Sequence, residues 1–226
     1  MTEKGEPPLR PDSRLDVVLD AKGLRALAHP VRVQLVWLLR KYGPSTATRL
    51  AERMGLTSGA TSYHLRQLGT AGFVEEDTER GNARERWWRA AHRSTWVTDL
   101  EVLSQDPEAG LAYLQSVAAV HVLQTQQSLN EFQTLPRAWR DVFDLSDLAL
   151  RLTPREAQDL LDDLSAVLAR YRRADEIAAT PEGAERVNLI LHLLPEPGLP
   201  AGPAADGSAQ DAPGDDGGAR PARETP

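Results

Sequence analysis

The 226-residue chain contains no cysteine. This absence excludes disulfide bonds, thiolate metal sites, cysteine nucleophiles and thiol redox switching. The five histidines lie far apart in the sequence, without the paired spacing that a histidine metal site uses. The sequence also lacks a phosphate-binding glycine loop, a Gly-x-Ser-x-Gly motif and a His-Glu-x-x-His motif. We therefore expect no metal site, no cofactor and no enzymatic activity.

Long apolar runs are missing as well. No stretch approaches the roughly 18 to 20 uninterrupted apolar residues that a membrane-spanning helix needs. The first eight residues mix both charges with two prolines, and no apolar segment of the kind found in a secretory signal follows them. The sequence thus predicts a cytoplasmic protein with no membrane partner.

Both ends of the chain have few large apolar residues. Residues 195–226 contain 7 Pro, 6 Gly and 7 Ala, and Leu199 is their only large aliphatic residue. Because such a segment buries too little apolar surface to offset its ordering entropy, we expect a disordered acidic tail, and likewise a disordered N-terminus at residues 1–13. The remaining sequence predicts one domain at residues 14–96 and a second at residues 97–194.

Charge is divided unevenly along the chain, whose net charge is -7. Residues 20–93 hold 13 Lys and Arg against 7 Asp and Glu, a net of +6, so the other residues carry a net of -13. Electrostatic attraction is local on the scale of the Debye length, about 8 Å at physiological salt. The basic segment can therefore bind a polyanion while the acidic remainder faces away from it.

Apolar spacing and helix-boundary residues predict a short strand at Leu15 to Leu19 and then four helices. The helices are expected at residues 21–28 after Asp20 as N-cap, at 30–42 after the His29-Pro30 break, at 45–54 before Gly55, and at 58–71 before Gly72. The third and fourth helices are joined by a tight turn that contains glycine, and a longer helix precedes them. This arrangement is typical of a helix-turn-helix.

A β-hairpin is expected directly after the fourth helix. Its strands are residues 73–76 and 84–89, on either side of a polar loop around Gly81-Asn82. A hairpin in this position is the wing of a winged helix-turn-helix. Trp87 and Trp88 should point to opposite faces of the second strand, so we expect one of them to anchor the wing on the core.

The fourth helix has a polar face suited to DNA. Thr61, Leu65 and Leu68 share the buried direction at 100° per residue. On the other face, Arg can pair with guanine, Gln with adenine, and hydroxyl groups with phosphate oxygens. The predicted DNA-binding residues are Thr57, Ser58, Gly59, Ser62, Tyr63, His64, Arg66 and Gln67 in and before the helix, and Arg80, Arg84 and Arg86 in the wing. His64 lies at the edge of the buried face and fits a partly buried histidine bonded to the backbone equally well.

The first domain contains four short motifs: AHPVR at residues 28–32, TATRLA at 46–51, SGATSYHLRQL at 58–68 and AGFV at 71–74. Together they resemble the winged helix-turn-helix domain of ArsR-type bacterial transcriptional regulators. The resemblance covers about residues 15–95. It implies a homodimer that binds a palindromic operator, usually as a repressor that a ligand or a metal releases. The cysteine motif of the metal-sensing members has no counterpart at residues 49–53, which excludes thiolate sensing. His121 alone stands where other members pair Asp with His, so we expect an unidentified small-molecule effector rather than a metal.

The second domain is expected to be mainly helical. Asp106-Pro107 starts a helix that can run to about Gln133, and in winged-helix regulators the broad apolar side of such a helix commonly contacts the other subunit. A second amphipathic helix should follow the capping box that starts at Thr153. Further core residues are expected at Trp139, Val142, Phe143 and Leu145. Residues 187–194 alternate as a strand, which would pair with Leu15 to Leu19 or with another strand.

These patterns predict a mainly α fold with a small β-hairpin wing: an N-terminal winged helix-turn-helix followed by a helical dimerisation and effector region. The predicted function is that of a sequence-specific DNA-binding transcriptional regulator. It would act as a dimeric repressor that places helix 58–71 in the major groove and uses hairpin 73–90 as the wing. The alternative is a winged-helix module for protein contact without specific DNA binding, which predicts an apolar or neutral exposed face on the fourth helix.

Overall fold

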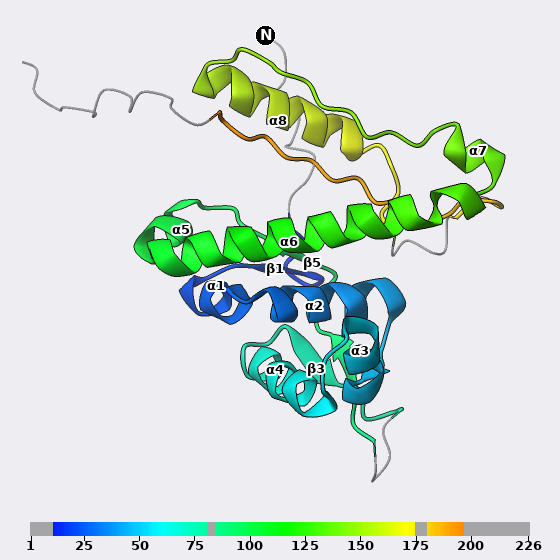
Figure 1. Ribbon diagram of the computed structural model, residues 1–226. Coiled ribbons are helices and arrows are strands. Elements are labelled where there is room, and N and C mark those ends of the chain that lie inside the picture. The colour runs from blue at the N-terminus through cyan, green and yellow to red at the C-terminus, as the bar shows by residue number, and fades with distance from the viewer. Residues whose placement is uncertain (1–10, 81–84, 175–179, 197–226) are drawn as a thin grey trace, which may run out of the picture. The chain divides into compact units, whose positions relative to one another are not determined.

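The computed structural model describes residues 11–80, 85–174 and 180–196. The chain divides into two units, residues 1–188 and 189–226, and the described part of the second unit contains no helix or strand. The helices are α1 (Ala21–Leu27), α2 (Pro30–Tyr42), α3 (Ala47–Met54), α4 (Ser58–Thr70), α5 (Glu101–Gln105), α6 (Pro107–Glu131), the 3₁₀ turn η1 (Phe132–Thr134), α7 (Arg137–Arg140) and α8 (Pro154–Leu168) (Figure 1). The strands are β1 (Asp16–Val18), β2 (Ser45–Thr46), β3 (Val74–Glu76), β4 (Trp87–Ala90) and β5 (Ser94–Trp96). A mainly helical fold with a small antiparallel hairpin after its first four helices confirms the predicted fold class.

The helix boundaries in the N-terminal half follow local side-chain chemistry. The Asp20 carboxylate accepts a hydrogen bond from the Gly23 N–H at 2.6 Å and so caps α1. Thr46 caps α3 in the same way, and Gly55 ends that helix in the left-handed conformation, with φ of 64°. The four predicted helices are therefore confirmed, with ends that differ by one or two residues from those expected.

The wing is the larger part of a three-stranded antiparallel sheet in the order β2, β4, β3. Trp88 of β4 is only 7% exposed and belongs to the hydrophobic core, while Trp87 is half-buried beneath the guanidinium of Arg49, 4.9 Å from the ring centroid. The prediction that one of the two tryptophans anchors the wing is confirmed. Strand β2, which the sequence analysis missed, pairs with β4 and holds the start of α3 against the wing.

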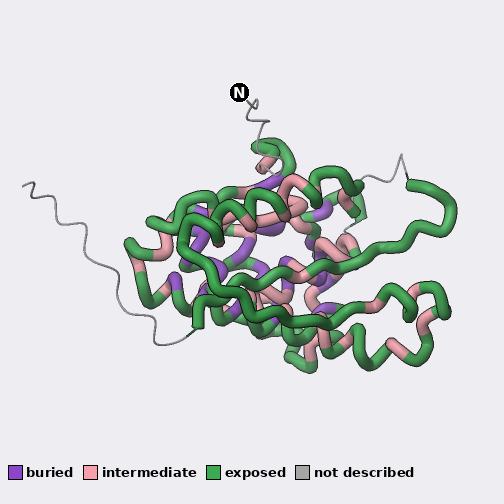
Figure 2. Tube along the Cα trace, turned by 90° about the horizontal axis from the view of Figure 1, so that it is seen from above, coloured by how far each residue is buried: buried purple, intermediate pink, exposed green. Residues whose placement is uncertain are grey.

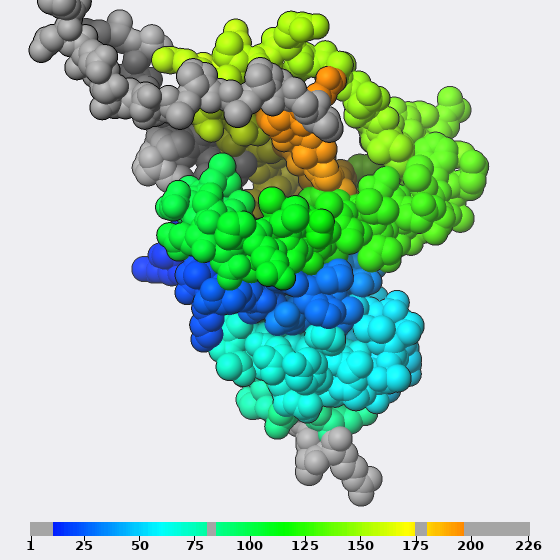
Figure 3. Space-filling model, turned by 60° about the vertical axis from the view of Figure 1, so that its left-hand side comes forward, coloured from blue at the N-terminus to red at the C-terminus, as the bar shows by residue number. Residues whose placement is uncertain are grey.

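Helix α6 packs on α1 and α2 and contributes Tyr113 to the same hydrophobic core. Figure 3 shows the atoms of α6, in green, lying directly against the blue N-terminal segments. Helices α3 and α4 lie on the side of α2 opposite α6 in Figure 1, so the predicted recognition helix and the long helix occupy separate surfaces. None of the described helices is both long enough and apolar enough to cross a membrane.

Helix α6 has a buried side and an exposed side. The residues buried inside the subunit are Gly110, Tyr113, Ser116 and Val120. Leu111 and Leu114, in contrast, are 58% and 50% exposed. The helix therefore has two apolar sides, and only one of them is covered by the described residues of this chain.

The predicted strand at residues 187–194 is wrong, because the structure describes these residues as extended chain without strand pairing. Strand β1 pairs instead in parallel with β5, which places Asp16 opposite Ser94. A segment with alternating apolar residues forms a strand only where a second strand supplies hydrogen bonds, and none of the described segments pairs with it. The alternating side chains Val187, Leu189, Leu191 and Leu193 are exposed, from 65% down to 39%.

The core predicted around residues 139–145 is also wrong in part. Val142 and Leu145 are each 68% exposed, and Trp139 and Phe143 are half-buried. Phe143 contacts Phe132 with ring centroids 5.1 Å apart, so this region packs locally and not into the main core. Figure 2 shows the buried residues, in purple, gathered in one region. Of the ends predicted to be disordered, 1–13 and 195–226, residues 1–10 and 197–226 fall outside the described residues, as do the hairpin loop at 81–83 and Arg84.

Candidate nucleic-acid interface

Helices α3 and α4 pack against each other and are joined by residues 55–57. Thr61 and Leu65 of α4 have no exposed surface, as the helical periodicity predicts. The start of α4 is fixed by Thr57, whose Oγ1 accepts a hydrogen bond from the Ala60 N–H at 3.2 Å. The Thr61 hydroxyl donates in turn to the Thr57 carbonyl oxygen at 3.1 Å. The predicted DNA-binding residue Thr57 is thus engaged as the N-cap of the helix.

The opposite face of α4 is open and carries most of the other predicted contacts. Ser58, Gly59, Tyr63, Arg66 and Gln67 are exposed, whereas Ser62 and His64 are half-buried. Arg66 is the only charged residue in the helix. A Cβ atom built on Gly59 would have no atom within 4 Å, so this position is also free of close neighbours. The structure brings these residues together on one exposed helix face.

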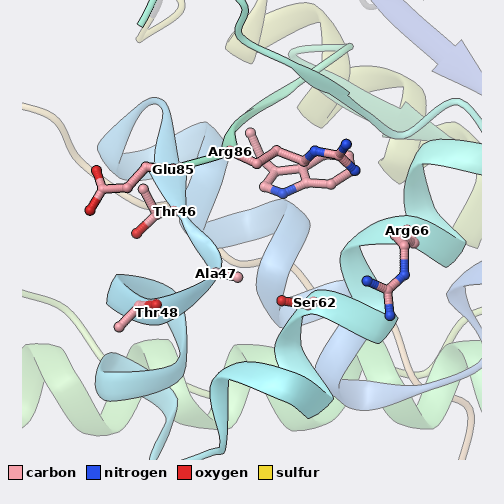
Figure 4. Close-up of a pocket in the computed structure, with 8 residues that line it drawn as sticks. Thr46, Ala47, Thr48, Ser62, Arg66, Glu85 and Arg86 are labelled. Carbon is pink, nitrogen blue, oxygen red and sulfur yellow. The ribbon is translucent and has the colours of Figure 1, made fainter. Parts of the chain in front are cut away.

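A pocket of about 310 Å³ lies between α4, the first turn of α3 and the wing. Ser62 and Arg66 line it from α4, and Arg86 lines it from the wing (Figure 4). Thr46 and Thr48, at the start of α3, close the remaining side. The pocket therefore joins the helix residues and one of the wing residues that the sequence analysis predicted separately.

The described wing arginines are each paired with a carboxylate. Arg80 lies 3.3 Å from Asp77, Arg86 lies 3.1 Å from Glu76, and the cross-strand partners Arg89 and Glu75 lie 2.9 Å apart. These arginines are more than half exposed, so each pair contributes at most about 1 kcal/mol. A phosphate group can displace such a carboxylate, but the pairs lower the attraction of the wing for a polyanion.

The helical body beneath the wing has a different charge balance. Residues 21–74 contain eight Lys and Arg but a single acidic residue, Glu52. Arg66 is the only one of these cationic residues on α4, and Lys22 lies beside that helix and donates to the Thr70 carbonyl oxygen at 3.2 Å. The positive potential of this region therefore comes from the helices, whereas the wing carries both signs of charge.

His64 packs beneath the exposed face, with its ring centroid 4.6 Å from that of His29 and 5.3 Å from that of Tyr63. Burial lowers the pKa of His64 below its usual value, and His29 and Arg32 lower it further. Its Nδ1 atom is buried without a hydrogen-bond partner among the described residues, so a backbone bond at that atom is absent. His64 is thus a neutral, half-buried histidine at the base of the candidate interface.

Three residues near this surface were not predicted as site residues. Thr46 and Thr48 line the pocket because β2 holds the start of α3 beside the wing, and the sequence gives no sign of this two-residue strand. Arg32 of α2 lies among His29, Tyr63 and His64. The sequence offers one sign that Arg32 has a special role. It lies off the apolar stripe of α2, a helix whose other residues are mostly buried or half-buried.

A metal centre finds no support in the described residues, which contain no group of three or more His, Asp or Glu side chains placed to bind an ion. No ligand set can therefore be assigned to a metal from this part of the chain.

Comparison with known protein families gives a match at the same segment. Residues 27–77 match the family model of a helix-turn-helix domain, which covers α2, α3, α4 and the first strand of the wing. No curated protein matches the chain significantly. A domain of this kind supports a DNA-binding regulator and is typical of proteins without enzymatic activity.

Proposed function

We propose that the chain is a sequence-specific transcriptional regulator similar to the ArsR type, with α4 as the helix that reads the major groove. The observation that carries this proposal is the position of Arg66. Its side chain is the only charge on α4, it is exposed, and with Ser62 it lines the pocket between α4 and the wing. An arginine in this position can donate two hydrogen bonds to guanine O6 and N7.

The surrounding residues suit the remaining parts of a DNA interface. Gln67 can pair with adenine, and the hydroxyl groups of Ser58, Ser62 and Tyr63 can donate to phosphate oxygens. Thr48, exposed at the first turn of α3, adds a further hydroxyl beside the pocket. Arg80 and Arg86 would contact phosphates of the flanking DNA after they exchange Asp77 and Glu76 for phosphate.

Helix α6 supplies the surface for a homodimer. Its residues 109–130 contain no Asp, Glu, Lys or Arg. The side that faces away from the core consists of apolar and small uncharged residues, among them Leu111, Ala118, Val122 and Leu129. A second copy of the same helix can cover this side without burying a charge, and alanine permits close approach of the two backbones. The dimer would place two copies of α4 about one turn of DNA apart, roughly 34 to 36 Å.

Repression relieved by a small-molecule effector is the mode of action that the resemblance implies. The pocket beside α4 opens on the proposed DNA surface, so we assign it to DNA contact and not to the effector. No residues are assigned to an effector site.

A second candidate function is supported by the wing. The carboxylate partners of Arg80, Arg86 and Arg89 make this hairpin nearly neutral, which suits a winged-helix module that contacts protein. The basic helices favour DNA, because residues 21–74 hold eight cationic side chains against one carboxylate.

Binding of the purified full chain to duplex DNA separates the two candidates. The fragments should span the region upstream of its own coding sequence, at several salt concentrations and with excess nonspecific competitor. We expect saturable binding by two chains per site that resists competitor and weakens steeply with salt. If a folded sample binds neither these fragments nor randomised duplex pools, the protein-contact function replaces the DNA-binding one.

A further inference from the structure

Arg32 of α2 is half-buried, and among the described residues no carboxylate forms an ion pair with it. Its Nε atom is buried without a hydrogen-bond partner among the described residues. A buried donor without a partner destabilises the fold, and more strongly when the group is charged. An arginine held in this way is expected to have a partner that the isolated chain does not supply.

The groups around Arg32 define the chemistry of that partner. His29 is the N-cap residue that precedes α2, and its Nδ1 accepts the Val31 N–H at 3.2 Å. When that ring is neutral, its proton is therefore on Nε2, which can donate. The second imidazole, His64, lies against His29 with the two ring planes tilted by 48°, and the phenol of Tyr63 is exposed beside it. The cluster thus holds a guanidinium, imidazole donors and a phenolic hydroxyl.

No carboxylate competes for this cluster from the helices that form it. Neither α2 nor α4 contains Asp or Glu. Burial lowers the pKa of His29, and the neighbouring charge of Arg32 lowers it further, as expected where a cation lacks a counter-ion. The positive end of the α2 dipole adds to the attraction for an anion.

From this arrangement we propose that Arg32, His29 and Tyr63 form a phosphate-binding site at the junction of α2 and α4. The guanidinium donates to two phosphate oxygens, and the phenol and the His29 Nε2–H donate to the same group. Because Tyr63 also lies on the recognition face, the group that fits best is a phosphodiester of the DNA backbone. This assignment rests on the proposed function, whereas the site itself would also accept a free phosphate group.

The first test compares DNA binding by three full-length variants. Arg32→Met removes the charge, whereas Arg32→Lys keeps the charge but loses the bidentate guanidinium donor. Arg137→Met is the matched control, because it removes one exposed positive charge from α7. We expect Arg32→Met to weaken binding by about tenfold on specific and random duplexes alike and to reduce the salt slope by about 0.9. Arg32→Lys should keep the salt slope and lose part of the affinity, and Arg137→Met should match the wild type.

The second test separates the two sources of phosphate. The imidazole signals of His29 and His64 are followed by NMR while either inorganic phosphate or a short duplex is added to the wild type and to Arg32→Lys. A saturable change with inorganic phosphate supports a site for a free phosphate group, and a change with duplex alone supports the DNA backbone. Thermal melting of each variant shows whether it is folded.

The proposal is overturned if folded Arg32→Lys and Arg32→Met bind DNA with the affinity and salt slope of the wild type and neither probe changes the histidine signals. This outcome leaves the proposed function intact when Arg66→Ala still weakens binding. Conversely, a wild-type chain that binds no DNA but gives a saturable phosphate response keeps the site and contradicts the proposed function.

Discussion

The carboxylate of Asp16 has no exposed surface and accepts two hydrogen bonds from the guanidinium of Arg93, at 2.9 and 3.1 Å. The Ser94 hydroxyl donates a third bond to the same carboxylate at 2.5 Å. These contacts join β1 to the end of the wing across more than 70 residues of sequence. The ion pair therefore connects the first strand to the segment that follows the wing.

The Asp16 pair should make stability depend on pH in the acid range. The hydrogen bonds from Arg93 hold the pKa of Asp16 well below its usual value, and those from Ser94 and the Asp12 backbone act in the same direction. A lowered pKa stabilises the fold above the unfolded value of about 3.9, and this contribution is lost as pH falls toward the folded value. Asp16→Asn should lower the free energy of unfolding by about 3 kcal/mol at pH 7, because the half-buried Arg93 loses its partner.

The measurement for Asp16 is urea denaturation at pH 7 and near pH 3. Asp162→Asn, an exposed carboxylate on α8, serves as the control and should match the wild type. The difference between Asp16→Asn and the wild type should shrink at the lower pH. Equal stability of the two proteins at pH 7 contradicts the structural role of this pair.

Gly59 should matter for DNA binding and not for folding. Nothing lies within 4 Å of a Cβ at this position, and alanine favours a helix over glycine by about 1 kcal/mol. Gly59→Ala should therefore melt at or above the wild-type temperature, yet bind DNA more weakly because the added methyl group separates the helix from the groove. The adjacent control Ala60→Gly should show the reverse pattern, with lower stability and unchanged affinity. An unchanged affinity for Gly59→Ala would remove this residue from the interface.

Glu76 should weaken the grip of the wing on DNA, because its carboxylate competes with phosphate for Arg86 at 3.1 Å. Glu76→Gln should raise DNA affinity by about threefold, and Arg86→Met should lower it on all sequences and reduce the salt slope. Glu101→Gln, an exposed carboxylate on α5, controls for the change in net charge. Fluorescence anisotropy on a labelled duplex measures all three. If Glu101→Gln tightens DNA binding as much as Glu76→Gln does, the effect comes from the change in net charge and not from the Glu76–Arg86 pair.

Val122 should hold the dimer together. It is 68% exposed on the uncharged side of α6, and a carboxylate there would be buried in the proposed contact between two copies. Val122→Glu should shift the protein from dimer to monomer in sedimentation velocity and weaken DNA binding as a consequence. Leu148→Glu replaces an apolar residue that is 84% exposed outside any helix and should remain dimeric. A dimeric Val122→Glu protein would place the subunit contact elsewhere.

Local signals were sufficient to predict the helices of the N-terminal half. The caps Asp20 and Thr57 bond to N–H groups three residues ahead, and Gly55 and Gly72 adopt positive φ angles at helix ends. These preferences act within one turn of helix, so the sequence displays them directly. The inward direction of Leu65 follows in the same way from the 3.6-residue period.

Features that depend on distant partners were not predictable. Strand β5 forms by pairing with β1, and among the described residues no strand pairs with the apolar residues at 187–194. On α6 both sides are apolar, so the helical period alone could not select Tyr113 as the buried side. The ion pairs of the wing were not predictable either. They depend on the register of the hairpin, which places Glu76 beside Arg86 and Glu75 beside Arg89.

Selection of binding sites from a randomised duplex pool by the wild type and by Arg66→Ala tests the central claim most directly. We predict that the wild type enriches a palindromic site with half-sites about 10 base pairs apart and a guanine in each. Arg66→Ala should remain folded and lose the preference for that guanine, a change of about 10- to 100-fold in affinity ratio. Enrichment of the same sequence by both proteins, with equal affinity, would contradict the assignment of α4 as the helix that reads DNA.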